Sequence, residues 1–285
     1  MWIKIGLQEI SPTTLVALRV LFGFLFCAVI IFTKRIKWPK NFKSWMPLLI
    51  LGITNFAIPF FLISWGEQSV DSSVASILDA TVPLFTIVIA HFLLKDDKMT
   101  LLKTSGLIIG FIGVIVLLSK DIGNSTGSFL GQAAVVLASL FYAGSSIYIR
   151  RTTQDTPGFI RSGVPLLSAS IIMWPVVYLT ENPVVFPTLE ISWIAILFLG
   201  IIGSGVAFVL AFYLIHEIGP TKTTMVTYLF PLGGIILGVV FLNEQLTWQL
   251  LAGGSLIVAS LIVANWQTTK SFVKTDIAVQ SASEN

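Results

Sequence analysis

The chain has 285 residues, of which 55% are hydrophobic and only 11% are charged, and its mean hydropathy is +0.91. Soluble domains carry about 25% charged residues, so this composition excludes an ordinary soluble domain and indicates a protein whose solvent is a lipid bilayer. The net charge of +3 comes from basic residues in particular loops rather than from a patch, so no nucleic-acid partner is predicted.

Apolar runs of about 20 residues, the length that crosses a hydrocarbon core, follow one another along the chain. The segment before the first run, Met1 to Ile10, is too short to span a membrane and lacks the residue order of a signal peptide. The sequence therefore predicts an all-α polytopic membrane protein. Nine complete spans are predicted, at Pro12–Thr33, Trp45–Gly66, Ser72–Leu94, Leu101–Leu118, Phe129–Ile149, Ile160–Thr180, Ile191–Ile215, Pro220–Leu242 and Thr247–Trp266.

Lys and Arg residues gather in alternate loops. The loop from Lys34 to Ser44 holds five of them, whereas the loops on the opposite side hold only Lys120. Because cytoplasmic loops of membrane proteins are enriched in Lys and Arg, we expect the basic side to face the cytoplasm. The prediction is a multi-pass protein of the cell membrane with its C-terminus in the cytoplasm.

One long stretch of the chain occurs twice. Ser72 to Thr100 returns in degenerate form as Pro220 to Thr247, and Pro83 matches Pro231 at an offset of 148 residues. The same offset pairs Asp96 with Glu244, which we interpret as turn residues or residues that place negative charge at a helix start. The predicted organisation is a first repeat at 1–118, a loop at 119–128, a second repeat at 129–266 and a polar cytoplasmic tail at 267–285.

The offset also predicts how the two repeats are oriented. A unit of five helices crosses the membrane an odd number of times, so its second copy is inserted upside down. Shifting Phe129–Ile149 back by 148 residues places it upstream of Met1. The fold prediction is therefore two inverted five-helix repeats on a ten-helix plan, with most of the first helix missing and nine complete spans in this chain.

Several segments together resemble the EamA-type drug/metabolite transporters. They are the WIKIGLQEISP start with Arg19 in the following helix, the prolines Pro83 and Pro231, and the LNEQLT turn with its weaker twin LKDDKMT. The resemblance covers nearly the whole chain. It implies a ten-helix carrier built from two inverted repeats that transports amino acids or related metabolites, more often by export. In that family the first helix helps to wall the central cavity, so an inactive truncated carrier is one alternative.

Three mid-span prolines mark candidate site residues. A proline cannot donate a hydrogen bond to the carbonyl four residues earlier. Each of the three therefore frees the carbonyl of a residue with a polar side chain. Pro59 frees that of Asn55, Pro83 that of Asp79 and Pro231 that of Thr227.

Asp79 is the most specific of these candidates. It lies eight residues beyond Asp71, so roughly 12 Å below the outer end of its helix and inside the hydrocarbon zone. An acid at that depth is costly and by default suggests a functional role, either binding a cationic group of the substrate or carrying a coupling proton. The alternative is a protonated structural Asp that is hydrogen-bonded to a neighbouring helix.

The predicted midplane cavity is bounded by Asn55, Asp79, Tyr142, Thr227 and Tyr228. Tyr142 belongs to a polar stripe on one face of Phe129–Ile149, which either lines the cavity or joins helices through hydrogen bonds. Other residues are assigned structural roles as hinges or in helix packing. These are Pro59, Pro83, Pro231, Arg19, Gly106, Gly110, Gly234 and Gly238. Gly106 and Gly110 could pack within one chain or between two.

Motif absences narrow the function further. The chain has no nucleotide-binding G-x-x-x-x-G-K-[ST] loop, no HExxH pair and no GxSxG elbow, and Cys27 is its single cysteine. We therefore expect no cofactor, no metal and no enzymatic activity. The expected partners are a small-molecule substrate, the lipid bilayer, and a coupling proton or counter-substrate. The alternatives are a non-catalytic membrane scaffold and, as a weaker one, an intramembrane enzyme. The sequence does not predict the oligomeric state.

Overall fold

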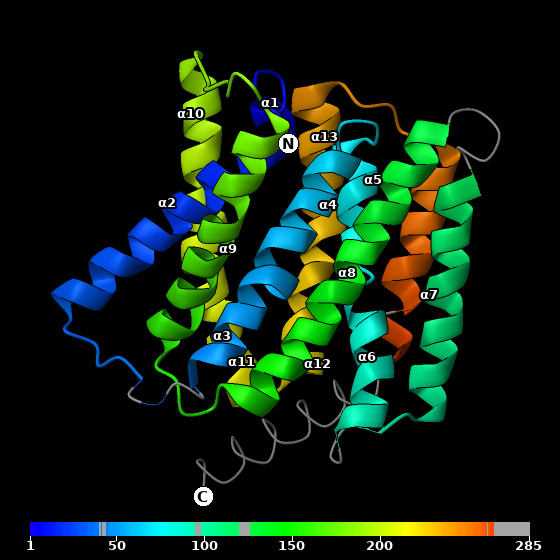
Figure 1. Ribbon diagram of the computed structural model, residues 1–285. Coiled ribbons are helices and arrows are strands. Elements are labelled where there is room, and N and C mark those ends of the chain that lie inside the picture. The colour runs from blue at the N-terminus through cyan, green and yellow to red at the C-terminus, as the bar shows by residue number, and fades with distance from the viewer. Residues whose placement is uncertain (40, 42–43, 95–97, 120–125, 261, 265–285) are drawn as a thin grey trace, which may run out of the picture.

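The computed structural model describes residues 1–39, 41, 44–94, 98–119, 126–260 and 262–264, and every regular element among them is a helix (Figure 1). This confirms the predicted all-α class. The tail from Gln267 and the acidic turn at Asp96 lie outside the described residues.

Eight helical segments in the described part of the chain are long and apolar enough to cross a membrane, and a shorter apolar helix, Trp248–Ala264, follows them. These nine segments correspond to the nine predicted spans, with boundaries that differ by a few residues. The eight long segments are Pro12–Thr33, Trp45–Gly66, Ser72–Leu93, Leu101–Ser119, Ser128–Thr152, Gly158–Thr180, Glu190–Ile218 and Pro220–Leu242.

Four of the spans are continuous helices or nearly so, and four are interrupted. The continuous ones are α2 (Pro12–Thr33), α7 (Leu101–Ser119), α8 (Thr126–Thr152) and α9 (Gly158–Thr180). The interrupted ones are α3 (Trp45–Leu51), η2 (Gly52–Ala57) and α4 (Ile58–Gly66); α5 (Ser72–Asp79) and α6 (Val82–Leu93); α10 (Glu190–Leu197), η3 (Phe198–Val206) and α11 (Ala207–Ile218); and α12 (Pro220–Thr224), η4 (Met225–Tyr228) and α13 (Leu229–Leu242). A short helix, α1 (Trp2–Gly6), precedes them.

The interruptions recur at the spacing of the sequence repeat. The π-helices η2 and η3 share positions 52–57 when η3 is shifted back by 148 residues. The break between α5 and α6 likewise matches the 3₁₀ segment η4 and the start of α13. Pro59 and Pro83 each lie within the first two residues of the helix that follows an interruption, where a proline costs no hydrogen bond. The two halves of the chain therefore share backbone irregularities as well as sequence.

Small residues allow the helices to approach closely. A Cβ on Gly234 would lie 1.7 Å from Ser76 Oγ, and one on Gly238 would lie 3.5 Å from the Cβ of Ser73, so α13 packs tightly along α5. A Cβ on Gly106 would lie 2.6 Å from the Cβ of Ala264. Gly110 similarly lies against Leu84 and Ser260, so both α7 glycines pack within this chain.

The largest apolar cluster forms where α2 packs along α9 and contacts η3. Gly23 of α2 and Gly200 of η3 lie against each other there, because a Cβ on Gly23 would be 3.0 Å from the Gly200 carbonyl oxygen. Many large apolar side chains on the outside of the bundle are exposed, as expected for a surface that contacts lipid.

Candidate functional site

The break between α5 and α6 places Asp79 inside the bundle. Asp79 is the last residue of α5, and the turn at Ala80 and Thr81 separates it from α6. Its Oδ1 lies 3.5 Å from Ser139 Oγ on α8, at the limit of a hydrogen bond. The same Ser139 hydroxyl has two carbonyl acceptors at 3.2 Å, the Leu78 and Val135 oxygens. The Asp79 carboxylate therefore keeps most of its capacity to accept hydrogen bonds.

Arg19 on α2 places a positive charge near Asp79. It interacts electrostatically with Asp79 and with Tyr142. Its Nε donates to Ser204 Oγ at 2.8 Å, and its guanidinium carbon lies 3.6 Å from the centre of the Phe60 ring, a cation–π contact. Arg19 is only 8% exposed. It therefore joins α2 to η3 and α4 while placing a buried positive charge near Asp79.

The π-helix η3 explains how Ser204 reaches Arg19. The hydroxyl of Ser204 also donates to the carbonyl of Leu199, five residues earlier, at 2.9 Å. A π-helix places residues five apart in register and widens the turn, and such segments occur often at functional sites. The irregular backbone thus holds the hydroxyl that accepts the Arg19 hydrogen bond.

Aromatic rings form the wall next to this polar group. Phe208 of α11 lies 4.7 Å from Phe56, 5.8 Å from Phe60 and 6.2 Å from Tyr142, between ring centroids. Phe212 lies 6.1 Å from Phe56. The rings come from η2, α4, α8 and α11, so helices from both halves of the chain meet here.

For the five predicted site residues, the structure records an interaction between one pair and the burial or hydrogen bonding of two others. Asp79 and Tyr142 interact electrostatically. Asn55 is buried in η2, and among the described atoms its Nδ2 has no hydrogen-bond partner. Thr227 is buried in η4, where its hydroxyl donates to the Thr224 carbonyl at 2.8 Å. The prediction for the Tyr228 side chain lies outside the described part of the structure.

A cavity of about 620 Å³ opens at one end of the bundle rather than at the predicted midplane. It lies where α1, the loop between α4 and α5, and the residues after α13 meet, at the top of Figure 1. None of the five predicted site residues lines it. Its lining consists of Lys4, Leu7, Gln8, Glu67, Gln68, Asp71, Leu242, Asn243, Glu244 and Gln245.

Glu67 is the residue of this cavity that sequence reasoning missed. It is only 7% exposed, although it directly follows the end of α4. Burial raises its pKa, while the amino group of Met1, the Ser72 hydroxyl and Lys4 oppose that effect and the Glu244 carboxylate adds to it. An acid just past a span was a weak signal, because such acids are usually solvated.

Metal binding has no support in the described residues, which contain no group of three or more His, Cys, Asp and Glu side chains placed to hold an ion.

Comparisons with known proteins agree with this architecture. The family model described as the EamA-like transporter family matches residues 1–119 and 129–266. The uncharacterized transporter YoaV of Bacillus subtilis is 27% identical over 266 residues, which cover 91% of this chain and 89% of YoaV. The uncharacterized inner membrane transporter YedA of Escherichia coli is 26% identical, with coverage of 92% and 84%. A solved crystal structure with 18% identity matches the fold with a TM-score of 0.68 over 93% of both chains.

Proposed function

The chain belongs to the EamA-like transporter family, and from this premise we propose that it is a secondary active transporter that exports small metabolites, amino acids or related compounds. It is a multi-pass membrane protein, since its relatives are transporters and eight helices in the described part of the chain are long and apolar enough to span a bilayer. In the proposed orientation the basic loops and the C-terminus face the cytoplasm.

The proposed mechanism is alternating access. The two halves act as inverted five-helix repeats that rock around a central site and expose it to one side of the membrane at a time. The recurrence of helix interruptions at the repeat spacing supports this proposal, because matching breaks give both halves hinges at equivalent depths.

The observation that carries the proposal is the partly buried Asp79 at the break between α5 and α6, with Arg19 and Tyr142 in electrostatic contact. A carboxylate in a membrane bundle normally faces a cavity or a partner. Here it has one weak hydrogen bond among the described residues, and aromatic rings from both halves lie close by. This arrangement suits an amine-bearing, partly apolar solute, or a proton that is exchanged for one.

Transport by the purified full chain in proteoliposomes tests the proposal. Vesicles loaded with each member of a panel of amino acids and related metabolites are assayed for saturable counterflow of the same labelled compound. Protein-free vesicles serve as the control. The expected result is saturable exchange of at least one compound that is recovered chemically intact. Recovery of a converted product would favour an enzyme, and exchange of nothing across the panel would favour a scaffold.

A further inference from the structure

Three carboxylates at the cavity end of the bundle each bind the start of a helix in the opposite half of the chain. Glu9 accepts from the backbone N–H groups of Thr188 and Leu189 at the start of α10, at 3.1 to 3.2 Å. Glu181 accepts from hydroxyls at the start of α2, including Thr14 Oγ1 at 2.7 Å. Carboxylates at helix N-termini are favourable because they meet unpaired N–H groups and the positive end of the helix dipole.

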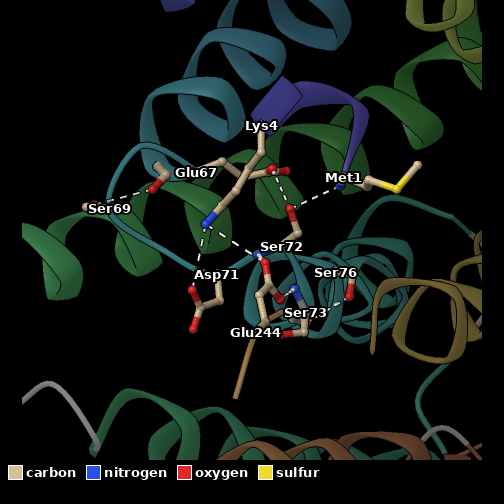
Figure 2. A network of polar contacts seen from close by, with 10 residues as sticks. Met1, Lys4, Glu67, Ser69, Asp71, Ser72, Ser73, Ser76 and Glu244 are labelled. Atoms are coloured by element: carbon tan, nitrogen blue, oxygen red, sulfur yellow. Dashed lines mark hydrogen bonds and ion pairs between the residues drawn. The ribbon is translucent and has the colours of Figure 1, made fainter. Parts of the chain in front are cut away.

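The third carboxylate, Glu244, makes the best-defined contact of this kind. Its two oxygens accept from the backbone N–H groups of Ser72 and Ser73 at 2.7 and 2.9 Å (Figure 2). Glu244 follows α13 in the second half, whereas Ser72 and Ser73 begin α5 in the first half. Separating the two halves at this end would break both hydrogen bonds.

Glu67 lies next to this contact and shares Ser72 with it. The hydroxyl of Ser72 donates to Glu67 Oε2 at 3.0 Å, while the N–H of the same residue donates to Glu244 (Figure 2). Both carboxylates line the 620 Å³ cavity. Glu67 is therefore a buried acid beside an inter-repeat contact, next to a space wide enough for water.

Charged groups from several elements face Glu67. The amino group of Met1, which directly precedes α1, donates to Ser72 Oγ at 3.0 Å. On α1, Lys4 Nζ lies 3.7 Å from Asp71 Oδ1 and 3.9 Å from Glu244 Oε1. Glu244 repels Glu67 from the other half. Deeper in the bundle, Asp79 on α5 and Arg19 on α2 also interact with it electrostatically. Glu67 thus connects the cavity end with the proposed site.

We propose that Glu67 is a positioning residue for transport, and that a proton taken up by its carboxylate from the cavity side holds the contact between Glu244 and the start of α5 closed. This inference rests on the proposed transport function. The proton binds to one carboxylate oxygen of Glu67 when the cavity end closes and returns to water when it opens. Because the proton is taken up from and returned to the same side, closure of this end depends on the pH of that side, with no net movement of protons across the membrane.

The electrostatics give the sign of the effect. In the closed arrangement, burial and Glu244 raise the pKa of Glu67 above its ordinary value of 4.5. Opening would return the carboxyl to water and lower its pKa toward that value. The closed arrangement therefore binds the proton more tightly and is favoured as the pH falls. Because one proton is involved, the open-to-closed ratio changes by no more than about tenfold per pH unit.

Cysteine accessibility in the full chain tests this inference without any solute. A Ser73→Cys reporter lies between α5 and α13, where Ser73 is 1% exposed, and an impermeant thiol reagent reaches it only when the two helices separate. The native Cys27 is fully buried. Dividing the labelling rate by that of a Gln68→Cys reporter, which is exposed at the same cavity, removes the effect of pH on thiol reactivity.

In the otherwise native chain, we expect the ratio of the Ser73→Cys labelling rate to the Gln68→Cys labelling rate to fall as the pH of the cavity side is lowered from about 8 to about 5. This range lies above the ordinary pKa of glutamate. Glu67→Gln, which mimics the protonated acid, should give a low ratio at every pH. Ser72→Ala removes a hydrogen bond that favours the charged carboxylate, so its transition should move to higher pH. Asp71→Asn, a more exposed acid of the same cavity, should keep the pH dependence.

A ratio that does not vary with pH in the native background, or that varies equally in Glu67→Gln, would overturn the inference. So would loss of the pH dependence in Asp71→Asn together with its retention in Glu67→Gln. If Glu67→Gln does not fold, the Ser72→Ala variant tests the inference: a transition at higher pH supports it, and an unchanged transition overturns it. Saturable transport with a pH-independent ratio would refute the role of Glu67 alone, whereas a Glu67-dependent ratio without transport of any solute would refute the proposed function.

Discussion

The two interrupted spans that match in the repeat, α5–α6 and α12–η4–α13, share a backbone plan but differ in chemistry. Both begin after equivalent positions, Asp71 and Gly219, and both are interrupted at equivalent positions of the repeat. At that depth the first copy has Asp79 and the second has Thr227. The first span is mostly buried in the protein, whereas few described residues of the second are. The repeat thus keeps the position of the interruption and places the ionisable group in one copy.

The matched π-helices show the same difference. Position 204 in η3 holds the serine that accepts the Arg19 hydrogen bond, and the equivalent position in η2 holds Phe56, which packs among aromatic rings. Similar backbones with different side chains are compatible with the proposed mechanism, in which both copies move but one holds the ionisable group.

The largest effect on stability is expected for Ser204→Ala. It leaves the buried guanidinium of Arg19 without its acceptor in η3, and a hydrogen bond to a charged group is worth about 1.5–3 kcal/mol. Ser64→Ala is the matched control, because Ser64 is equally buried and its hydroxyl has no partner among the described atoms. Thermal unfolding in detergent measures both. Equal losses of stability would contradict a special role for Ser204.

A somewhat smaller effect is expected for Gly234→Ala, which tests the packing of α13 on α5. The added Cβ would lie 2.3 Å from the Cβ of Ser76, and overpacking of this kind costs about 1–3 kcal/mol. At the neighbouring Gly233 an added Cβ meets nothing within 4 Å, so Gly233→Ala should be neutral or slightly stabilising. The two melting curves are compared directly. A destabilised Gly233→Ala, or an unaffected Gly234→Ala, would show that the two spans are packed differently.

The smallest effect concerns the acid contacts at the cavity end. Burial favours a higher pKa for Glu181, but the Ser11, Thr13 and Thr14 hydroxyls outweigh it and hold the pKa below 4.5. A lowered folded-state pKa stabilises the protein above the ordinary value, and this contribution is lost as the pH falls through the folded-state pKa. Stability at acid pH should therefore fall less in Glu181→Gln than in the native chain.

The control for this titration is Glu217→Gln, which changes an exposed acid at the opposite end of the bundle. Its unfolding midpoint should follow the native pH profile. If stability falls by the same amount at acid pH in Glu181→Gln and in the native chain, the hydroxyl contacts do not stabilise the charged carboxylate.

Much of this fold follows from the sequence because apolar length and the 148-residue offset are strong signals. Prolines predicted the interruptions less well than the repeat does. Pro165 and Pro175 lie inside α9 without ending it, while η3 forms where glycines, not prolines, interrupt the span. Whether a proline breaks a membrane helix depends on what the neighbouring helices supply to the freed carbonyl, which a single sequence does not show.

The candidate site shows a similar division. Asp79 was identifiable because an acid in the middle of an apolar run has few explanations. Glu67 was not, because its position just after a span is typical of a solvated acid, and only the packing of α1 and the Glu244 segment buries it. The predicted contribution of Asn55 and Thr227 remains a prediction.

Solute counterflow in proteoliposomes, with Asp79→Asn and Thr227→Val measured side by side, tests most directly whether Asp79 takes part in transport. Losing a charged partner worth about 1.5–3 kcal/mol should slow Asp79→Asn roughly tenfold to a hundredfold, while Thr227→Val, which removes no charge, should lose less. Native transport by Asp79→Asn, or equal losses in both variants, would contradict the proposal that the ionisable group of the transport site lies in the first copy of the repeat.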